Sequence, residues 1–168
     1  MNALYIVSLS LHVLSACVWV GGMVFFAAVM VPLSRKGELE SYKDRLLLWS
    51  GLRFRAIGWV CLSLLVLTGL YNLHALGFHW ADAFDGRLWQ GPFGHTLAHK
   101  LVLVAIILLI SALHDFWIGP KAVRLKETAG GGSKGRSLSV LASWIARFNL
   151  IFAVVVVILG VILARGGA

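Results

Sequence analysis

Residues 92–120 read PFGHTLAHKLVLVAIILLISALHDFWIGP, an apolar run long enough to cross a lipid bilayer. Three histidines interrupt this run. His95 and His99 are one helical turn apart and therefore share a face of the expected helix. His114 lies further along, about 22 Å from His99 on the helix axis and about 60° around it. Because ionisable residues at membrane depth are rare and costly, this stretch predicts a functional site on a membrane-spanning helix.

The composition is that of a membrane protein. Of the 168 residues, 60% are hydrophobic, and the mean hydropathy is +0.88, whereas soluble domains are roughly 45–50% apolar. The sequence therefore predicts an all-α integral membrane protein in which residues 1–168 form a single four-helix transmembrane domain. The expected spans are approximately residues 4–31, 56–76, 92–119 and 141–164.

The formal net charge of +8 is distributed unevenly, and this predicts the orientation in the membrane. Two segments hold 12 of the 15 basic residues. The first segment carries Arg35, Lys36, Lys43, Arg45, Arg53 and Arg55, and the second carries Lys121, Arg124, Lys126, Lys134, Arg136 and Arg147. By the positive-inside rule both segments are cytoplasmic, so both termini are expected in the periplasm of a bacterial inner membrane. Anionic lipid accounts for these charges, and no nucleic-acid partner is expected.

Two histidines on different expected spans fall at similar depth. If the first helix starts near Asn2, His12 is about 15 Å inside, and if the third starts at Pro92 on the same side of the bilayer, His99 is about 10 Å inside. His74 and His95 form a shallower level, with His79 in the loop above them. The periplasmic half of the protein is therefore expected to carry two tiers of imidazole groups.

Paired imidazoles from different helices are the ligands that a b-type haem needs. Our first hypothesis is a membrane cytochrome that transfers electrons, with His12 and His99 as axial ligands of haem b. Trp19 would pack against the macrocycle, and His74 or His95 would hold propionates or a second centre. If the protein is an enzyme, this hypothesis makes it a haem-dependent oxidoreductase.

Copper import is the alternative hypothesis. Imidazoles bind Cu(II) well, and softer thioether ligands bind Cu(I). His74, His79 and His95 would collect the ion outside, and His12 and Met23 would carry it inward. A third hypothesis is a structural subunit whose histidines only form hydrogen bonds. The candidate metal ligands are His12, His74, His95, His99 and His114.

Short motifs in the first three spans resemble those of a known family. They are Leu11-His12 with Trp19-Val20-Gly21-Gly22, then Arg53-Phe54-Arg55 leading to Thr68-Gly69-Leu70, and His99-Lys100-Leu101 running to His114 and Pro120. In order and spacing they are similar to the copper-resistance CopD domain family and, more distantly, to the HemJ-type protoporphyrinogen oxidases.

The resemblance implies a four-helix inner-membrane protein associated with copper movement into the cytoplasm or with haem-dependent chemistry on a porphyrinogen. Lys100 lies within the matching motif and is included among the candidate cofactor-binding residues. The expected partners are the lipid bilayer and either a quinone or a periplasmic carrier of electrons or copper.

Overall fold

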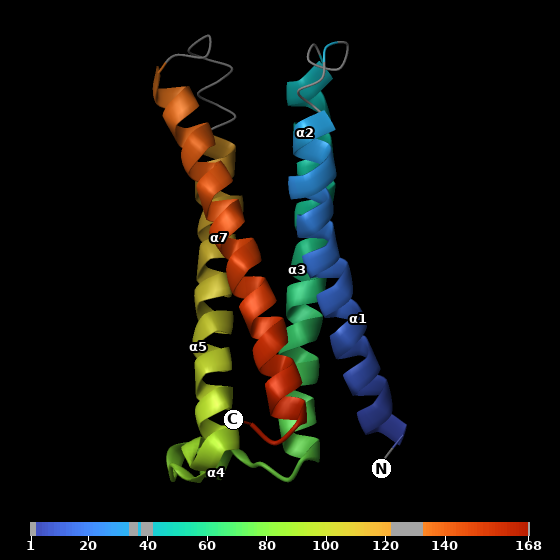
Figure 1. Cartoon of the computed structure of the whole chain (residues 1–168), viewed down its shortest axis with the longest axis vertical. Coiled ribbons are helices and arrows are strands. Elements are labelled where there is room, and N and C mark those ends of the chain that lie inside the picture. The colour runs from blue at the N-terminus through green and yellow to red at the C-terminus, as the bar shows by residue number, and fades with distance from the viewer. Residues whose placement is uncertain (1–2, 34–36, 38–41, 122–132, 168) are drawn as a thin grey trace. The chain divides into compact units, whose positions relative to one another are not determined.

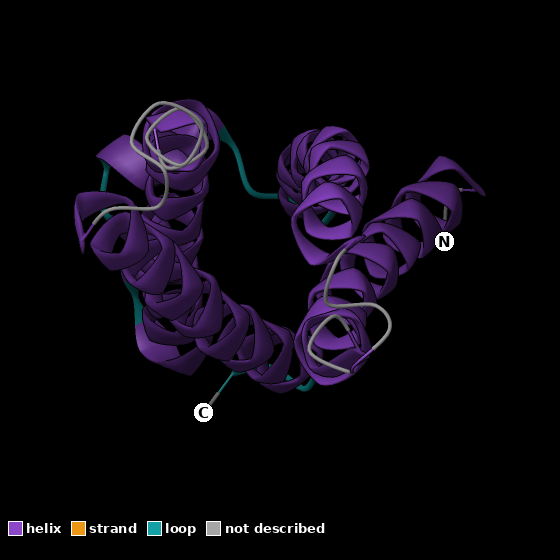
Figure 2. Cartoon of the chain, turned by 90° about the horizontal axis from the view of Figure 1, so that it is seen from above, coloured by secondary structure: helices purple, strands orange, loops and turns teal. Residues whose placement is uncertain are grey.

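The computed structural model describes residues 3–33, 37, 42–121 and 133–167, and nearly all of these residues are helical (Figure 2). No strand occurs among them. The elements are α1 (Ala3–Phe25), the π-helical segment η1 (Phe26–Met30), α2 (Val31–Leu33), α3 (Lys43–Ala75), α4 (Trp80–Phe84), the 3-10 turn η3 (Arg87–Trp89), α5 (Gly91–Leu113), the π-helical segment η4 (His114–Ile118) and α7 (Ser133–Ala164).

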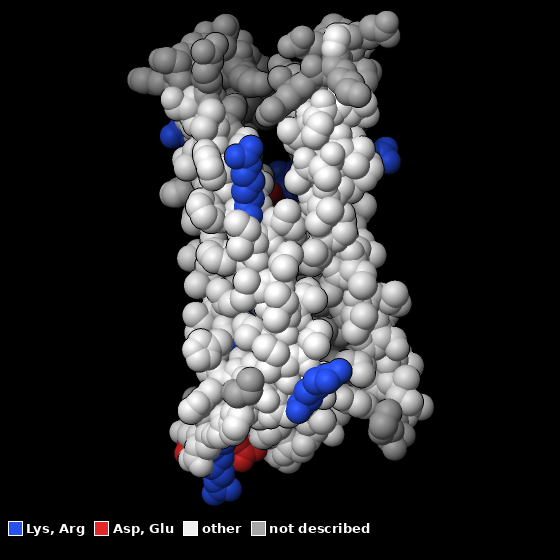
Figure 3. Space-filling view, viewed as in Figure 1, with Lys and Arg blue, Asp and Glu red and all other residues white. Residues whose placement is uncertain are grey.

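Within the described residues, four helical stretches are long and apolar enough to cross a membrane, which confirms the predicted all-α membrane fold. They are Ala3–Leu33, Arg45–Ala75, Gly91–Lys121 and Val140–Ala164. Many large apolar side chains on them are exposed, and the face in Figure 3 is mainly uncharged between the ends of the helices. The periplasmic location of the termini stays a prediction. Arg35, Lys36, Arg124 and Lys126, on which it partly rests, lie outside the described residues.

Two helices begin earlier than their apolar runs. The second helix starts at Lys43, not near residue 56, and the fourth starts at Ser133, not near residue 141. Lysine, arginine and leucine are strong helix formers, so the basic run before residue 56 continues the helix beyond the apolar segment. The apolar run marks the part of a helix that lies in lipid, which is shorter than the helix itself.

The chain divides into two compact units, residues 1–90 and 91–168, and each is described by itself. The single-domain organisation expected from the sequence therefore stays a prediction.

In the first unit α1 runs antiparallel to α3 along its length (Figure 1). Near the start of α1, the Ser8 hydroxyl donates to the Thr68 carbonyl at 3.5 Å. Just after the end of α1, the ring centroids of Phe26 and Phe54 lie 5.2 Å apart. Gly22 makes the close approach possible, because the Phe54 ring fills the space that a Cβ on Gly22 would occupy.

In the second unit α5 runs antiparallel to α7. The contacts proceed from Phe93 beside Gly167, through Lys100 beside Gly160, to Ser111 hydrogen-bonded to Asn149. Lys100 is half-buried, and its Nζ lies 3.3 Å from the position of a Cβ on Gly160. The Lys100 amino group therefore lies against a glycine of the neighbouring helix, where any larger residue would crowd it.

We predict that Gly22→Ala destabilises the first unit by about 1–3 kcal/mol, because the added methyl group overlaps the Phe54 ring. The measurement is unfolding in mixed detergent and dodecyl sulfate micelles, followed by circular dichroism. Gly21→Ala is the matched control, since a Cβ on Gly21 has no neighbouring atom within 4 Å. Equal unfolding midpoints for the two variants would contradict the predicted packing.

Candidate functional site

His12 is held in one orientation by Thr68 of the neighbouring helix. The Thr68 hydroxyl donates to the Leu64 carbonyl of its own helix at 2.5 Å, and its oxygen accepts a hydrogen bond from His12 Nδ1 at 2.8 Å. A neutral imidazole that carries its proton on Nδ1 has its lone pair on Nε2. Metal-bound histidines commonly have their other ring nitrogen fixed by such a contact.

Gly69 allows the His12 ring to lie close to α3. A Cβ at Gly69 would be 3.4 Å from His12 Cε1, which is van der Waals contact, so a side chain longer than that of alanine would press on the ring. Thr68 and Gly69 are adjacent, and together they provide the hydrogen-bond acceptor and the space for the imidazole. Sequence reasoning placed both residues in a family motif but gave neither a role.

Trp19 is buried inside the first unit, with 7% of its surface exposed. Its ring packs against α3, where Cδ1 and Nε1 both lie 3.6 Å from the position of a Cβ on Gly58. A packing role explains this position. Contact between Trp19 and a macrocycle stays a prediction.

His99, on α5 in the second unit, also has its Nδ1 fixed by a neighbouring oxygen. Its Nδ1 donates to the backbone carbonyl of His95 at 2.7 Å. A carbonyl only accepts, so the neutral His99 ring also has its lone pair on Nε2. Because His12 and His99 belong to different units, their pairing around one haem stays a prediction.

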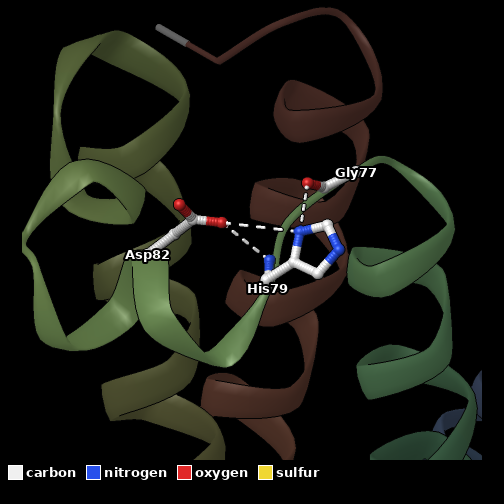
Figure 4. Close-up of polar contacts among 3 residues, drawn as sticks. All are labelled: Gly77, His79 and Asp82. Carbon is white, nitrogen blue, oxygen red and sulfur yellow. Dashed lines mark hydrogen bonds and ion pairs between the residues drawn. The ribbon is translucent and has the colours of Figure 1, made fainter.

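His74 and His79 lie together in the first unit, at the end of α3 and the start of α4. Their ring centroids are 5.5 Å apart, and the rings are nearly perpendicular, at 83°. His79 Nδ1 donates to the Gly77 carbonyl at 3.1 Å (Figure 4). Asp82 fixes the backbone of the same residue, since its Oδ2 accepts the His79 N–H at 2.7 Å and lies 3.9 Å from Nδ1.

His114 lies at the start of η4, beside the carboxylate of the next residue. Its Nδ1 is 2.9 Å from Asp115 Oδ1, and 33% of the His114 side chain is exposed. This contact again leaves the lone pair of a neutral ring on Nε2. π-Helical turns within α-helices are frequent at functional sites.

The structure therefore groups the candidate residues unevenly. It places His74 and His79 side by side and links the His99 ring to the His95 backbone, while His12 contacts Thr68. Among the described residues, no three His, Cys, Asp or Glu side chains lie close enough to hold one metal ion. The role of Asp82 was missed from the sequence, although its spacing of three residues from His79 matches a helix-capping pattern.

Comparison with known proteins gives two matches. Residues 51–163 match the family model CopD, copper resistance protein D. An uncharacterized protein of Aquifex aeolicus (strain VF5) is 32% identical over 162 residues, which cover 94% of each chain. No solved structure matches the chain. The similarity to HemJ-type oxidases stays a prediction.

We predict that Thr68→Val destabilises the first unit by about 1–3 kcal/mol, because the His12 Nδ1–H loses its acceptor without a large change in side-chain volume. Thr68→Ser keeps the hydroxyl and is the matched control. The measurement is the unfolding midpoint in mixed micelles. If valine and serine at position 68 have the same effect, the hydrogen bond does not stabilise the unit.

Proposed function

Because the chain belongs to the CopD (copper resistance protein D) family, we propose that it binds copper at the His74–His79 pair and passes the ion into the membrane toward His12. The chain is a membrane protein of this family with four candidate spans. The observation that carries the proposal is the spacing of the two imidazole rings.

The ring spacing distinguishes two ways in which a pair of imidazoles binds a metal. A metal at about 2.0–2.1 Å from a ring nitrogen lies about 3.2 Å from the ring centroid. Two rings on opposite sides of a haem iron would have centroids about 6.4 Å apart, whereas two rings that meet one ion at about 110–120° have centroids about 5.2–5.6 Å apart. The His74–His79 distance of 5.5 Å matches the second arrangement.

Two imidazoles leave coordination positions of the ion open. Water or a donor from a carrier protein would fill these positions, and such ligands exchange readily. A site of this kind suits uptake and release better than permanent storage. The Gly77 carbonyl and the Asp82 carboxylate lie beside His79 Nδ1. They hold the ring so that Nε2 is the nitrogen that can bind the ion.

The seam between α1 and α3 offers polar groups along the inward direction. Asn72 lies one helical turn from Thr68 on the same face of α3, and its side-chain oxygen is buried with no hydrogen-bond partner among the described residues. His12 contacts Thr68, which is about 9 Å along the helix axis from His74. His12 is therefore the next imidazole of the first unit that an ion leaving the His74–His79 pair would reach along α3.

We predict that His74→Ala and His79→Ala each weaken copper binding at least about tenfold, because each removes one of the two imidazole donors. Asp82→Asn weakens binding about tenfold through the second coordination shell. The measurement is copper content after equilibrium dialysis of the detergent-purified protein against buffered copper. Asp85→Asn is the matched control in the same loop.

An edge-to-face contact between the two rings, with no metal, also gives a spacing of 5.5 Å. Undiminished copper content in both histidine variants would show that the rings only pack against each other.

Haem b binding for electron transfer is the second candidate function. The observation that favours it is the hydrogen-bond pattern that His12 and His99 share, since each donates Nδ1–H to a fixed oxygen and has its lone pair on Nε2. These two ring nitrogens would hold the haem iron, and a bound haem would supply one-electron transfer. His12 and His99 would be its ligands.

Under this second function we predict that the purified protein has the sharp absorption bands of a bis-imidazole haem after reduction. His12→Ala and His99→Ala would each abolish these bands, while His79→Ala would keep them and lose copper. A protein that is colourless after expression with ample haem, or one whose spectrum survives both substitutions, would exclude haem ligation by this pair.

A further inference from the structure

A polar group interrupts the apolar contact between α5 and α7 in the second unit. Ile107 and Ala153 are almost fully buried, with 2% and 1% of their surfaces exposed. One helical turn from each of them, Asn149 Nδ2 donates to Ser111 Oγ at 3.1 Å. This hydrogen bond satisfies one end of the Asn149 amide.

The other end of that amide lacks a partner. Asn149 Oδ1 is buried and accepts no hydrogen bond from any described residue. Burying an amide oxygen in an apolar environment without a hydrogen-bond donor costs a few kcal/mol of free energy. The hydrocarbon region of a bilayer offers no water to act as that donor. The group that completes this site is therefore a hydrogen-bond donor.

A second acceptor set lies one turn beyond Ser111, at the start of η4. His114 and Asp115 follow Ser111 by three and four residues and so share its face of the helix. With Nδ1–H donated to Asp115, the neutral His114 ring presents an acceptor at Nε2. Together with Asn149, this face offers acceptors to a ligand and favours one that brings its own O–H or N–H groups.

Aromatic residues neighbour these acceptors along the sequence of both helices. The rings of Trp144 and Phe148 on α7 are 6.1 Å apart and inclined by 32°, and Phe148 directly precedes Asn149. Trp117, within η4, has 75% of its surface exposed. Exposed aromatic rings on a membrane-spanning helix offer flat apolar surface to a planar ligand that enters from the lipid.

We propose that Ser111, His114, Asp115 and Asn149 bind the head group of a membrane hydroquinone. Its hydroxyl groups supply the donors that Asn149 Oδ1 and His114 Nε2 lack, its ring is planar, and its hydrophobic tail remains in the lipid. A phospholipid phosphate carries only acceptors and negative charge, and Asp115 would repel it. The inference concerns binding alone and holds whether the protein handles copper or haem.

The test is titration calorimetry of the full-length protein in nanodiscs with a short-chain alkyl hydroquinone. We expect Asn149→Leu to weaken binding about tenfold, since it removes the buried acceptor. The same hydroquinone with both hydroxyls methylated has no donors, so it should bind the unaltered protein about tenfold more weakly and should not distinguish it from the variant. His114→Gln should weaken hydroquinone binding by a smaller factor.

Asn72→Leu is the matched control, because it removes the buried amide oxygen of the first unit that also lacks a partner. It should leave hydroquinone affinity unchanged. Circular dichroism checks folding, and if Asn149→Leu does not fold, the methylated compound and His114→Gln carry the test. No binding to the unaltered protein, equal binding of the methylated compound, or equal binding of a short-chain phospholipid would overturn the proposal and leave water or lipid as the occupant.

Discussion

A polar side chain between two membrane helices must find its hydrogen-bond partners inside the protein, and the Thr68 hydroxyl meets this requirement in both directions. It donates to its own helix at Leu64 and accepts from His12 on the neighbouring helix. The hydroxyl proton is satisfied by a carbonyl of α3, while the hydroxyl oxygen fixes the protonation and direction of an imidazole on α1. The same contact therefore joins the two helices of the first unit and fixes the direction of the His12 ring.

The helices of the chain were predictable from its apolar runs, whereas the details of its polar groups were not. Four segments of bilayer length give four spans because lipid requires every backbone group to bond within its own helix. The starts at Lys43 and Ser133 escaped prediction because helix formation continues through charged residues that hydropathy assigns to loops. The π-helical turn at His114 left no signal in the residue pattern.

The histidines illustrate what spacing along a chain can and cannot predict. Periodicity correctly indicated that His95 and His99 share a helical turn, but the actual contact joins the His99 ring to the His95 backbone and not to its imidazole. The nearness of His74 and His79 depends on the turn at Gly77, where φ is +92°. Glycine adopts such a backbone angle readily, and a helical pattern extended past Ala75 would have placed the two rings incorrectly.

If the loop binds copper as proposed, Asp82 would couple ion binding to local folding. Its carboxylate caps α4 through the His79 N–H and lies near the ring nitrogen of the same residue. A cation on the far side of the imidazole would make Nδ1–H a stronger donor and draw it toward these oxygens. By thermodynamic reciprocity, occupancy of the ring would stiffen the loop, and any event that unwinds α4 would lower affinity for the ion. A protein that binds this loop would then distinguish the ion-bound form from the ion-free form.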